Sequence, residues 1–329
     1  MALFDRDEPL AGDDERTTRD DQRARVKLLE LRMRRMVSTV LSGAYRSSFR
    51  GSGIEFDEVR PYQPGDEVRS IDWNVTARTG AAHIKTYQEE RQLVVDLLVD
   101  VSASMRFGSR ISKLDAAEQF TALISCAAEL QRDPVGLNLF ADGPTDHLPA
   151  RSGIEQTQRI LIALERARRE APRAGDGAGF ATALEELERV LRRRTLLFVV
   201  SDFHADSEGW IDPLRRLAQR HDVVAVRVSD ALERELPAEL GLVPVFDPES
   251  GARVELDCGS RRVRSWWAER ARERDEAFQR ATRRARVETI ELSTPAWDPD
   301  RRSRTDELLD VEPVIGFFRR RARSKGAPA

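Results

Sequence analysis

The 329-residue sequence predicts an α/β protein built on a doubly wound, mostly parallel sheet. Short, almost continuously apolar segments alternate with longer segments whose apolar residues recur at helical spacing. Strands that are apolar on both faces are typical of a parallel sheet covered by helices on both sides. A third observation is that two aspartates, Asp100 and Asp202, each follow one of the apolar segments closely.

The N-terminal part of the chain differs from the rest. Residues 1–21 are polar and acidic, which predicts a disordered tail. Apolar residues then recur at helical spacing over residues 26–41, so we expect one amphipathic helix that ends near Gly43. Residues 44–90 are rich in glycine, proline and aromatic residues, which predicts short strands and turns. We therefore expect residues 22–91 to form a helix followed by a small β-rich module.

The α/β alternation occupies residues 92–294. Within it, a turn rich in proline and glycine at residues 247–251 predicts a β-hairpin. Residues 295–329 should add a terminal helix and a basic tail. The predicted strands are 93–99, 135–140, 196–200, 223–228 and 287–292, the hairpin strands are 242–246 and 252–256, and the helices are 113–130, 154–169, 181–193, 208–220, 261–284 and 305–323.

Composition argues against several classes of protein. The formal net charge is -3, whereas nucleic-acid binders usually carry a basic excess. The apolar segments are far shorter than the ~20 residues that cross a bilayer, and the N-terminus lacks the features of a signal peptide. Cys126 and Cys258 form no CxxC pair, so neither a zinc site nor a disulfide framework is indicated. We expect a cytoplasmic protein without nucleic-acid binding or membrane insertion.

Oxygen-bearing side chains follow two of the predicted strands. Asp100, Ser102 and Ser104 come after the first strand at alternate positions, and Asp202 follows the strand 196–200. Ligands of doubly wound sheets bind at the carboxyl ends of the strands, where the strand order reverses. Carboxylates and hydroxyls there suit Mg²⁺ better than zinc. The alternative is that these residues are ordinary turn residues and helix caps.

Two motifs resemble known families. Asp100-Val101-Ser102-Ala103-Ser104 resembles the metal-ion-dependent adhesion site of von Willebrand factor A domains. The run RPYQPGDEVRSIDWN, from Arg60 to Asn74, is similar to the signature of the bacterial domain of unknown function 58 family. Members of that family couple such a β-rich module to a von Willebrand factor A-like domain. The resemblance covers roughly residues 26–323.

The resemblance implies a ligand set for Mg²⁺, or for another divalent cation. Ser102 and Ser104 would be direct ligands, and Asp100 and Asp202 would bind directly or through water. The family also places a threonine on a second loop, where this chain reads Ala178-Gly179-Phe180. Either the nearby Thr182 substitutes, or the site lacks a ligand.

The function implied by the resemblance is protein binding, not catalysis. The partner would be a MoxR-type AAA+ ATPase that supplies an acidic ligand to the ion, and the chain would act as an adaptor in chaperone-like assembly or maturation of other proteins. The client protein cannot be named from the sequence. Two alternatives stay open: a Mg-dependent phosphoryl-transfer or hydrolytic enzyme, and a metal-free scaffold. Against the enzyme, no second aspartate follows two residues after Asp100, and no lysine falls near the later strand ends.

Two further expectations concern single residues. His204 lies in the loop after Asp202, where a lone histidine is expected to face solvent. In the β-rich module, Tyr62 and Trp73 are expected to fill a small core, and Asp66 to pair with a nearby arginine such as Arg60. The alternative for this module is a contact surface for a partner.

Overall fold

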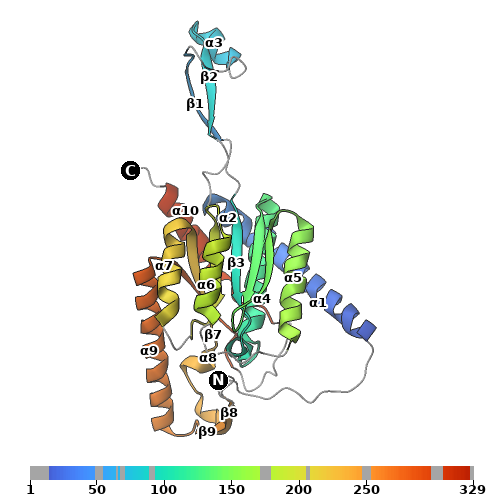
Figure 1. The fold of residues 1–329 in the computed structure, drawn as a ribbon, viewed down its shortest axis with the longest axis vertical. Helices are drawn as coiled ribbons and strands as arrows, with labels where there is room; N and C mark the ends of the chain where they lie inside the picture. The colour runs from blue at the N-terminus through green and yellow to red at the C-terminus, as the bar shows by residue number, and fades with distance from the viewer. Residues whose placement is uncertain are drawn as a thin grey trace.

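A computed structural model describes residues 15–48, 55–63, 66, 71–88, 93–170, 179–204, 208–246, 253–297 and 307–326. Its centre is a six-stranded sheet with the strand order β10-β7-β6-β3-β4-β5 (Figure 1). All neighbouring pairs are parallel except the edge strand β5, which is antiparallel to β4. The strands are β3 (Val95–Asp100), β4 (Val135–Phe140), β5 (Pro144–Arg151), β6 (Leu196–Ser201), β7 (Asp222–Ser229) and β10 (Glu288–Ser293).

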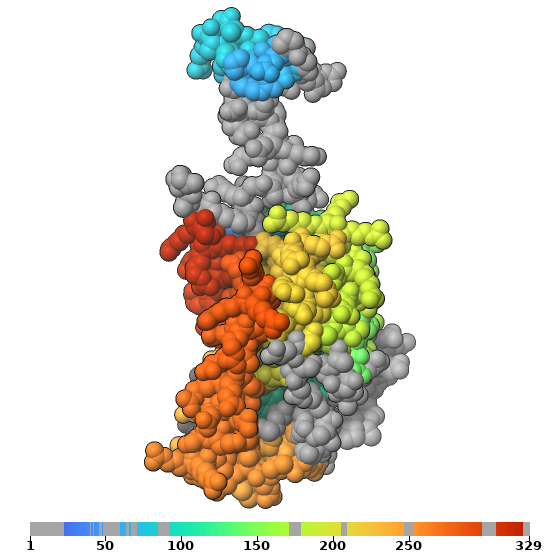
Figure 2. Space-filling model, turned by 60° about the vertical axis from the view of Figure 1, so that its left-hand side comes forward, coloured from blue at the N-terminus to red at the C-terminus, as the bar shows by residue number. Residues whose placement is uncertain are grey.

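Helices cover both faces of this sheet (Figure 1). One face packs against α4 (Lys113–Gln131), α5 (Ile154–Arg169) and α10 (Glu312–Gly326), and α1 (Glu15–Met36) packs against α4 and α5. The other face packs against α6 (Gly179–Val190), α7 (Ile211–Arg220) and α9 (Arg261–Ala285). Figure 2 shows α9, in orange, running along the outside of the molecule beside α7.

Because helices cover both faces of the sheet, its strands carry apolar residues on both faces. Successive residues of a strand point to opposite faces, so Leu97 joins the core beneath α4 and Leu98 joins the core beneath α6. Both side chains are no more than 1% exposed. The predicted doubly wound, mostly parallel sheet is therefore confirmed.

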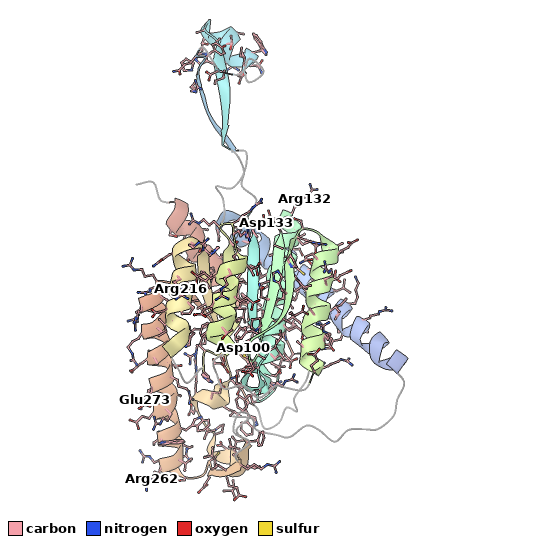
Figure 3. All side chains as sticks on the ribbon, in the orientation of Figure 1. Asp100, Arg132, Asp133, Arg216, Arg262 and Glu273 are labelled. Carbon is pink, nitrogen blue, oxygen red and sulfur yellow. The ribbon has the colours of Figure 1, made fainter. Side chains whose placement is uncertain are left out.

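The order of the strands locates a crevice. The chain runs from β3 outward to β4 and β5, and then returns to form β6 on the other side of β3. The order thus reverses between β3 and β6, which is where doubly wound sheets bind ligands. Figure 3 places Asp100 at the carboxyl ends of these strands, away from Arg132 and Asp133 at the opposite edge.

The structure differs from expectation in three ways, two of them in the N-terminal region. The first helix, α1, begins at Glu15, inside the segment 1–21 that was expected to be a tail; residues 1–14 lie outside the described residues. It does not end near Gly43, because a π-helical turn (Val37–Leu41) carries it into α2 (Ser42–Ser48). The edge strand β5 was not predicted, since its alternating, largely polar sequence contains two prolines.

The predicted β-rich module contains one antiparallel pair, β1 (Glu55–Pro61) with β2 (His83–Gln88), and a short helix, α3 (Trp73–Thr79). Asp72 caps α3 by accepting hydrogen bonds from Asn74 N and Val75 N. The predicted pair of Arg60 with Asp66 is present at 2.7 Å. Trp73 is 69% exposed, however, so the prediction that it fills a core is wrong. The first residue of α3 points outward, where it meets solvent.

A small third core lies below the carboxyl edge of the sheet. The predicted hairpin is present as β8 (Leu242–Phe246) and β9 (Arg253–Asp257). Together with α8 (Ala231–Arg234) and the start of α9 it encloses Phe107, Leu232 and Trp267. Phe107 belongs to the loop after β3, so this core supports that loop from beneath. No helix among the described residues is long and apolar enough to span a membrane.

Candidate metal centre

Asp100 ends β3 and is buried at the crevice between β3 and β6. Its Oδ1 accepts a hydrogen bond from Ser102 N at 2.9 Å, and its Oδ2 accepts one from Ser201 Oγ at 2.7 Å. The second bond follows from the register: Val99 pairs with Val200, so the next residues, Asp100 and Ser201, are also neighbours. Burial, and then the charge of Asp202, raise the pKa of Asp100 to about 6.

The two predicted hydroxyl ligands lie side by side on the loop after β3. Ser102 Oγ and Ser104 Oγ are 3.2 Å apart. Ser102 precedes a 3₁₀ turn, Ala103–Arg106, whose Met105 is fully buried and whose Arg106 donates to the carbonyl of Arg168. These contacts hold the loop in place while both serines are only half-buried. The hydroxyls are therefore reachable from outside.

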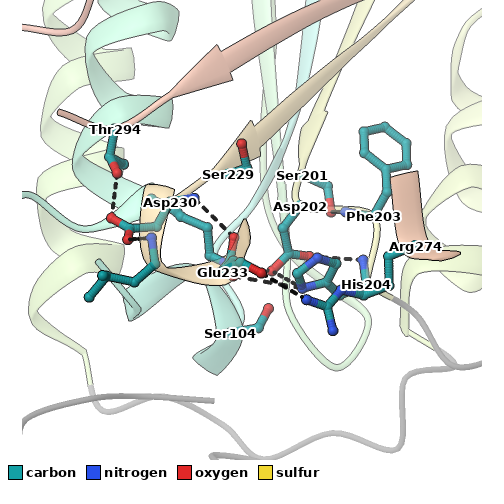
Figure 4. A network of polar contacts seen from close by, with 12 residues as sticks. Ser104, Ser201, Asp202, Phe203, His204, Ser229, Asp230, Glu233, Arg274 and Thr294 are labelled. Carbon is teal, nitrogen blue, oxygen red and sulfur yellow. Dashed lines mark hydrogen bonds and ion pairs between the residues drawn. The ribbon is translucent and has the colours of Figure 1, made fainter. Parts of the chain in front are cut away.

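Asp202 lies on the next loop and makes an ion pair inside the molecule. Lys113, in the first turn of α4, places its Nζ 2.6 Å from Asp202 Oδ2 and 2.6 Å from Glu233 Oε1. The Lys113 side chain is 1% exposed. Figure 4 shows Asp202, His204, Glu233 and Arg274 converging on one place, with Ser104 nearby. One buried ammonium thus joins a carboxylate of the loop after β6 to a carboxylate of α8.

The pKa values of Asp202 and Lys113 depend on each other. Burial by itself would raise the pKa of Asp202, but Lys113 and then His204 outweigh it and hold that pKa well below its usual range. Burial would likewise lower the pKa of Lys113, yet Asp202 and Glu233 raise it. Both groups are therefore charged at neutral pH, since each stabilises the charged form of the other.

His204 is close to this cluster and does not simply face solvent. Its Nδ1 lies 3.6 Å from Asp202 Oδ2 and 3.9 Å from Glu233 Oε1, and its side chain is 24% exposed. Burial lowers the pKa of His204 more than the nearby carboxylates raise it. A neutral imidazole is the form that ligates metals. Asp202, His204 and Glu233 each offer one ligand atom, and these atoms lie within 4.8 Å of one another.

Phe203, between Asp202 and His204 in the sequence, has a left-handed backbone with φ of 55°. Its ring packs against the rings of Trp210 and Phe278, at centroid distances of 5.4 and 4.9 Å. Phe203 N also donates to Ser201 Oγ at 3.0 Å. Aromatic packing from the outer helices thereby fixes the loop that carries Asp202.

Thr182 differs from the other predicted ligands in its burial. It is exposed in the first turn of α6, whereas Asp100 and Asp202 are 5% and 2% exposed. A Cβ at Gly179 would come within 2.4 Å of the Ala141 carbonyl oxygen and of Gly143 N, so the start of α6 fits tightly against the loop after β4. Residues 171–178, which precede it, lie outside the described residues.

Of the predicted ligands, the structure brings Asp100, Ser102, Ser104 and Asp202 to one crevice.

The donor set fits a hard divalent cation. Two ligands at right angles on Mg²⁺, each at about 2.1 Å, are about 3 Å apart, which is close to the 3.2 Å between the two hydroxyl oxygens. Asp100 adds a carboxylate, whose two oxygens accept hydrogen bonds from Ser102 N and Ser201 Oγ. Asp202 is different, because Lys113 already holds one of its oxygens.

Comparison with known proteins places the chain in a family. The family model described as "Protein of unknown function DUF58" matches residues 58–277. The chain belongs to the DUF58 family. Uncharacterized proteins of Mycobacterium tuberculosis and Mycobacterium bovis are 36% identical to it over 234 residues, which is 71% of this chain and 73% of theirs.

Solved structures give weaker likenesses. BatB from Bacteroides thetaiotaomicron aligns with a TM-score of 0.38 and 14% identity, covering 62% of this chain and 91% of BatB. An aerotolerance-related membrane protein from Bacteroides fragilis aligns with a TM-score of 0.41 and 12% identity, covering 70% and 99%. The manganese-loaded TRAP protein of Plasmodium vivax aligns with a TM-score of 0.29 and 23% identity, covering 41% and 57%.

Three residues of this DUF58 chain's crevice were missed by sequence reasoning. Ser201 could have been found, because it directly precedes Asp202 and must neighbour the end of β3. Lys113 and Glu233 gave no such signal, since they lie 89 and 31 positions from Asp202 on different helices. Lys113 also corrects the expectation that no lysine stands near the later strand ends, because it reaches the end of β6 from α4.

Proposed function

We propose that this chain is a protein-binding adaptor of the von Willebrand factor A type, which binds its partner through a divalent cation, Mg²⁺, at the crevice between β3 and β6. The observation that carries the proposal is the pair of half-buried hydroxyls, Ser102 Oγ and Ser104 Oγ, 3.2 Å apart beside the buried carboxylate of Asp100. These residues would hold the ion, which would supply a positive charge with an open coordination position.

The partner that suits such a site offers a carboxylate. An aspartate or glutamate from another protein can complete the coordination of an ion whose other ligands are hydroxyls and water. The family resemblance points to a MoxR-type AAA+ ATPase in the cytoplasm, so the chain would help such an ATPase assemble or mature other proteins. We assign no catalytic reaction to the chain, because Lys113, the cation beside the carboxylates, already has both of them as partners.

Binding to a purified MoxR-type ATPase from the same organism tests this proposal. The wild-type chain should bind it in Mg²⁺, and affinity should fall at least about tenfold in EDTA or with Ser104→Ala, which removes one ligand oxygen. Asp212→Ala is the matched control, because Asp212 is exposed on α7 and should leave binding unchanged. Calorimetry gives the affinities, and circular dichroism checks that each variant is folded.

Other outcomes would point to the alternatives. Binding that ignores both EDTA and Ser104→Ala would indicate a metal-free scaffold. Hydrolysis of a generic phosphoester by the wild type, but not by Asp100→Ala, would indicate a Mg-dependent enzyme.

A further inference from the structure

A positive charge already stands inside the candidate metal centre. Lys113 Nζ is 2.6 Å from Asp202 Oδ2 and 2.6 Å from Glu233 Oε1, with the side chain 1% exposed. An ammonium therefore occupies the space between two carboxylates where a cation would be coordinated. Its position is further limited by the ring of Phe107, whose centroid lies 5.8 Å from Nζ.

The same carboxylates belong to the group that could hold a metal. Asp202, His204 and Glu233 offer ligand atoms within 4.8 Å of one another, and the ammonium is hydrogen-bonded to two of the three. A divalent ion that used Asp202 as a ligand would lie beside Nζ. Two cations held at one buried carboxylate repel each other, so binding of the ion weakens the hold of Asp202 on the ammonium.

Glu233 is held firmly enough to retain the lysine alone. Its Oε2 accepts from Asp230 N at 2.9 Å, as part of a capping box at the start of α8. Its carbonyl accepts from Arg274 at 3.1 Å. Glu233 thus has a fixed position that does not depend on Asp202.

We propose that Lys113 is a built-in competitor of the divalent ion for Asp202. Without the ion, the ammonium is paired with both Asp202 and Glu233; when the ion binds, Nζ leaves Asp202 and stays with Glu233. This inference rests on the proposed metal site and adds its regulation: the fold is stable without metal, and the ion binds weakly enough to be released. A partner's carboxylate that adds a further negative charge would then favour the ion over the ammonium.

Mn²⁺ binding to the full chain tests the competition, followed by calorimetry and by the electron paramagnetic resonance signal of free Mn²⁺. Lys113→Met keeps the length and apolar character of the side chain but removes its charge, so it should bind Mn²⁺ at least about tenfold more tightly than the wild type. In EDTA the variant should melt at a lower temperature, because two buried carboxylates lose their counter-charge. Mn²⁺ should then raise its Tm more than it raises the wild-type Tm.

Three further variants serve as controls for this test. Lys27→Met removes the same charge from an exposed position on α1 and should leave Mn²⁺ binding unchanged. Lys113→Gln retains hydrogen-bond donors and serves if the methionine variant does not fold. Adding Ser104→Ala to Lys113→Met should weaken the gained binding, which would place the ion at the loop after β3.

Four results would overturn the competition. Equal Mn²⁺ affinity in the wild type and Lys113→Met would leave the metal site intact but show that the ammonium does not compete. Weaker binding by the variants would mean that Lys113 supports the ion by positioning Asp202. Gained affinity that survives Ser104→Ala would mean a new site on the Asp202, His204 and Glu233 group only. Absence of binding in every protein would reject the proposed metal-dependent function as well.

Discussion

At the scale of single residues, Asp96 is a carboxylate placed inside the sheet. It lies in β3 with 2% of its surface exposed, and Asn138 on β4 donates to its Oδ1 at 2.5 Å. His147 Nδ1, 2.6 Å from Asn138 Oδ1, extends this chain of hydrogen bonds to the surface of β5. Gly136, opposite Asp96 in the register, leaves room for the carboxyl group, since a Cβ there would approach Asp96 Oδ2 to 2.6 Å.

Burial gives Asp96 an unusual titration. Removal from water raises the pKa of Asp96 from 3.8 to about 7, although the hydrogen bonds work in the opposite direction. The folded protein therefore holds this proton to a higher pH than the unfolded chain does. The free energy of unfolding therefore falls as the pH rises from 3.8 to about 7. Above about pH 7 the loss of stability is complete, at up to about 4 kcal/mol.

Asp96→Asn should remove this pH dependence. The amide keeps the shape and an acceptor for Asn138, and it does not titrate. The free energy of unfolding of the variant should exceed that of the wild type by up to about 4 kcal/mol at pH 8, and the difference should shrink to about 1.5 kcal/mol at pH 5. Urea unfolding at the two pH values measures it, with the exposed Asp212→Asn as control. A difference that is the same at both pH values would contradict the titration of Asp96.

At the scale of elements, ion pairs tie the helix α1 to the body of the protein: Arg34 pairs with Glu129 on α4 at 2.6 Å, and Arg25 contacts several carboxylates. Arg25 contacts Asp115 and Glu118 on α4 and Glu165 on α5, the first two at 3.2 and 2.7 Å. Glu118 and Glu165 are almost completely buried. Burial raises the pKa of Glu118 to about 7 even though Arg25 lowers it. The arginine is thus the counter-charge for carboxylates that water cannot reach.

Arg25→Ala should release α1. Glu165 keeps Arg168 and Arg169 as partners, but the variant leaves the buried Glu118 without a counter-charge. The free energy of unfolding should therefore fall by about 3 kcal/mol. Amide hydrogen exchange should become faster in α1 than in α4, since the Arg25 ion pairs are what joins α1 to the buried carboxylates of its neighbours. Arg166→Ala is the matched control, because Arg166 is 63% exposed and should cost well under 1 kcal/mol. Unchanged exchange in α1 would show that apolar packing alone holds the helix.

The sequence predicts this helix but not its attachment. The apolar spacing after residue 26 depends only on neighbours along the chain, so it is visible in the sequence. The partners of Arg25 at Glu118 and Glu165 lie 93 and 140 positions away, and nothing local marks them. The candidate site divides in the same way: Asp100, Ser102 and Ser104 share one loop and were predicted, whereas Lys113 meets Asp202 only through the fold.

At the scale of the whole molecule, Phe318 on α10 joins the two ends of the chain to the sheet. Its ring lies 5.4 Å from that of Tyr45 on α2 and 6.4 Å from that of Phe198 on β6. Ser48 Oγ also donates to the Phe318 carbonyl at 2.6 Å. The apolar residues near the C-terminus predicted a helix here, but only the structure shows that this helix packs against the N-terminal one.

Phe318→Ala should therefore destabilise the entire domain. The side chain is fully buried between three elements, so its truncation should lower the free energy of unfolding by about 3–5 kcal/mol. Phe246→Ala, at a residue that is 37% exposed on the β8–β9 hairpin, should cost far less. Urea unfolding followed by both tryptophan fluorescence and circular dichroism provides the measurement. A loss below about 1 kcal/mol would mean that the C-terminal helix is an appendage.

The left-handed backbone of Phe203 has a consequence for communication across the molecule. A side chain other than glycine in this conformation costs about 1–2 kcal/mol, and here the rings of Trp210 and Phe278 offset that cost from outside the loop. The orientation of Asp202 is thus imposed by α9 and by the turn before α7, not by the local sequence. A protein that bound to the outer surface of α9 and displaced Phe278 would shift Phe203, the residue next to Asp202, without contacting the crevice.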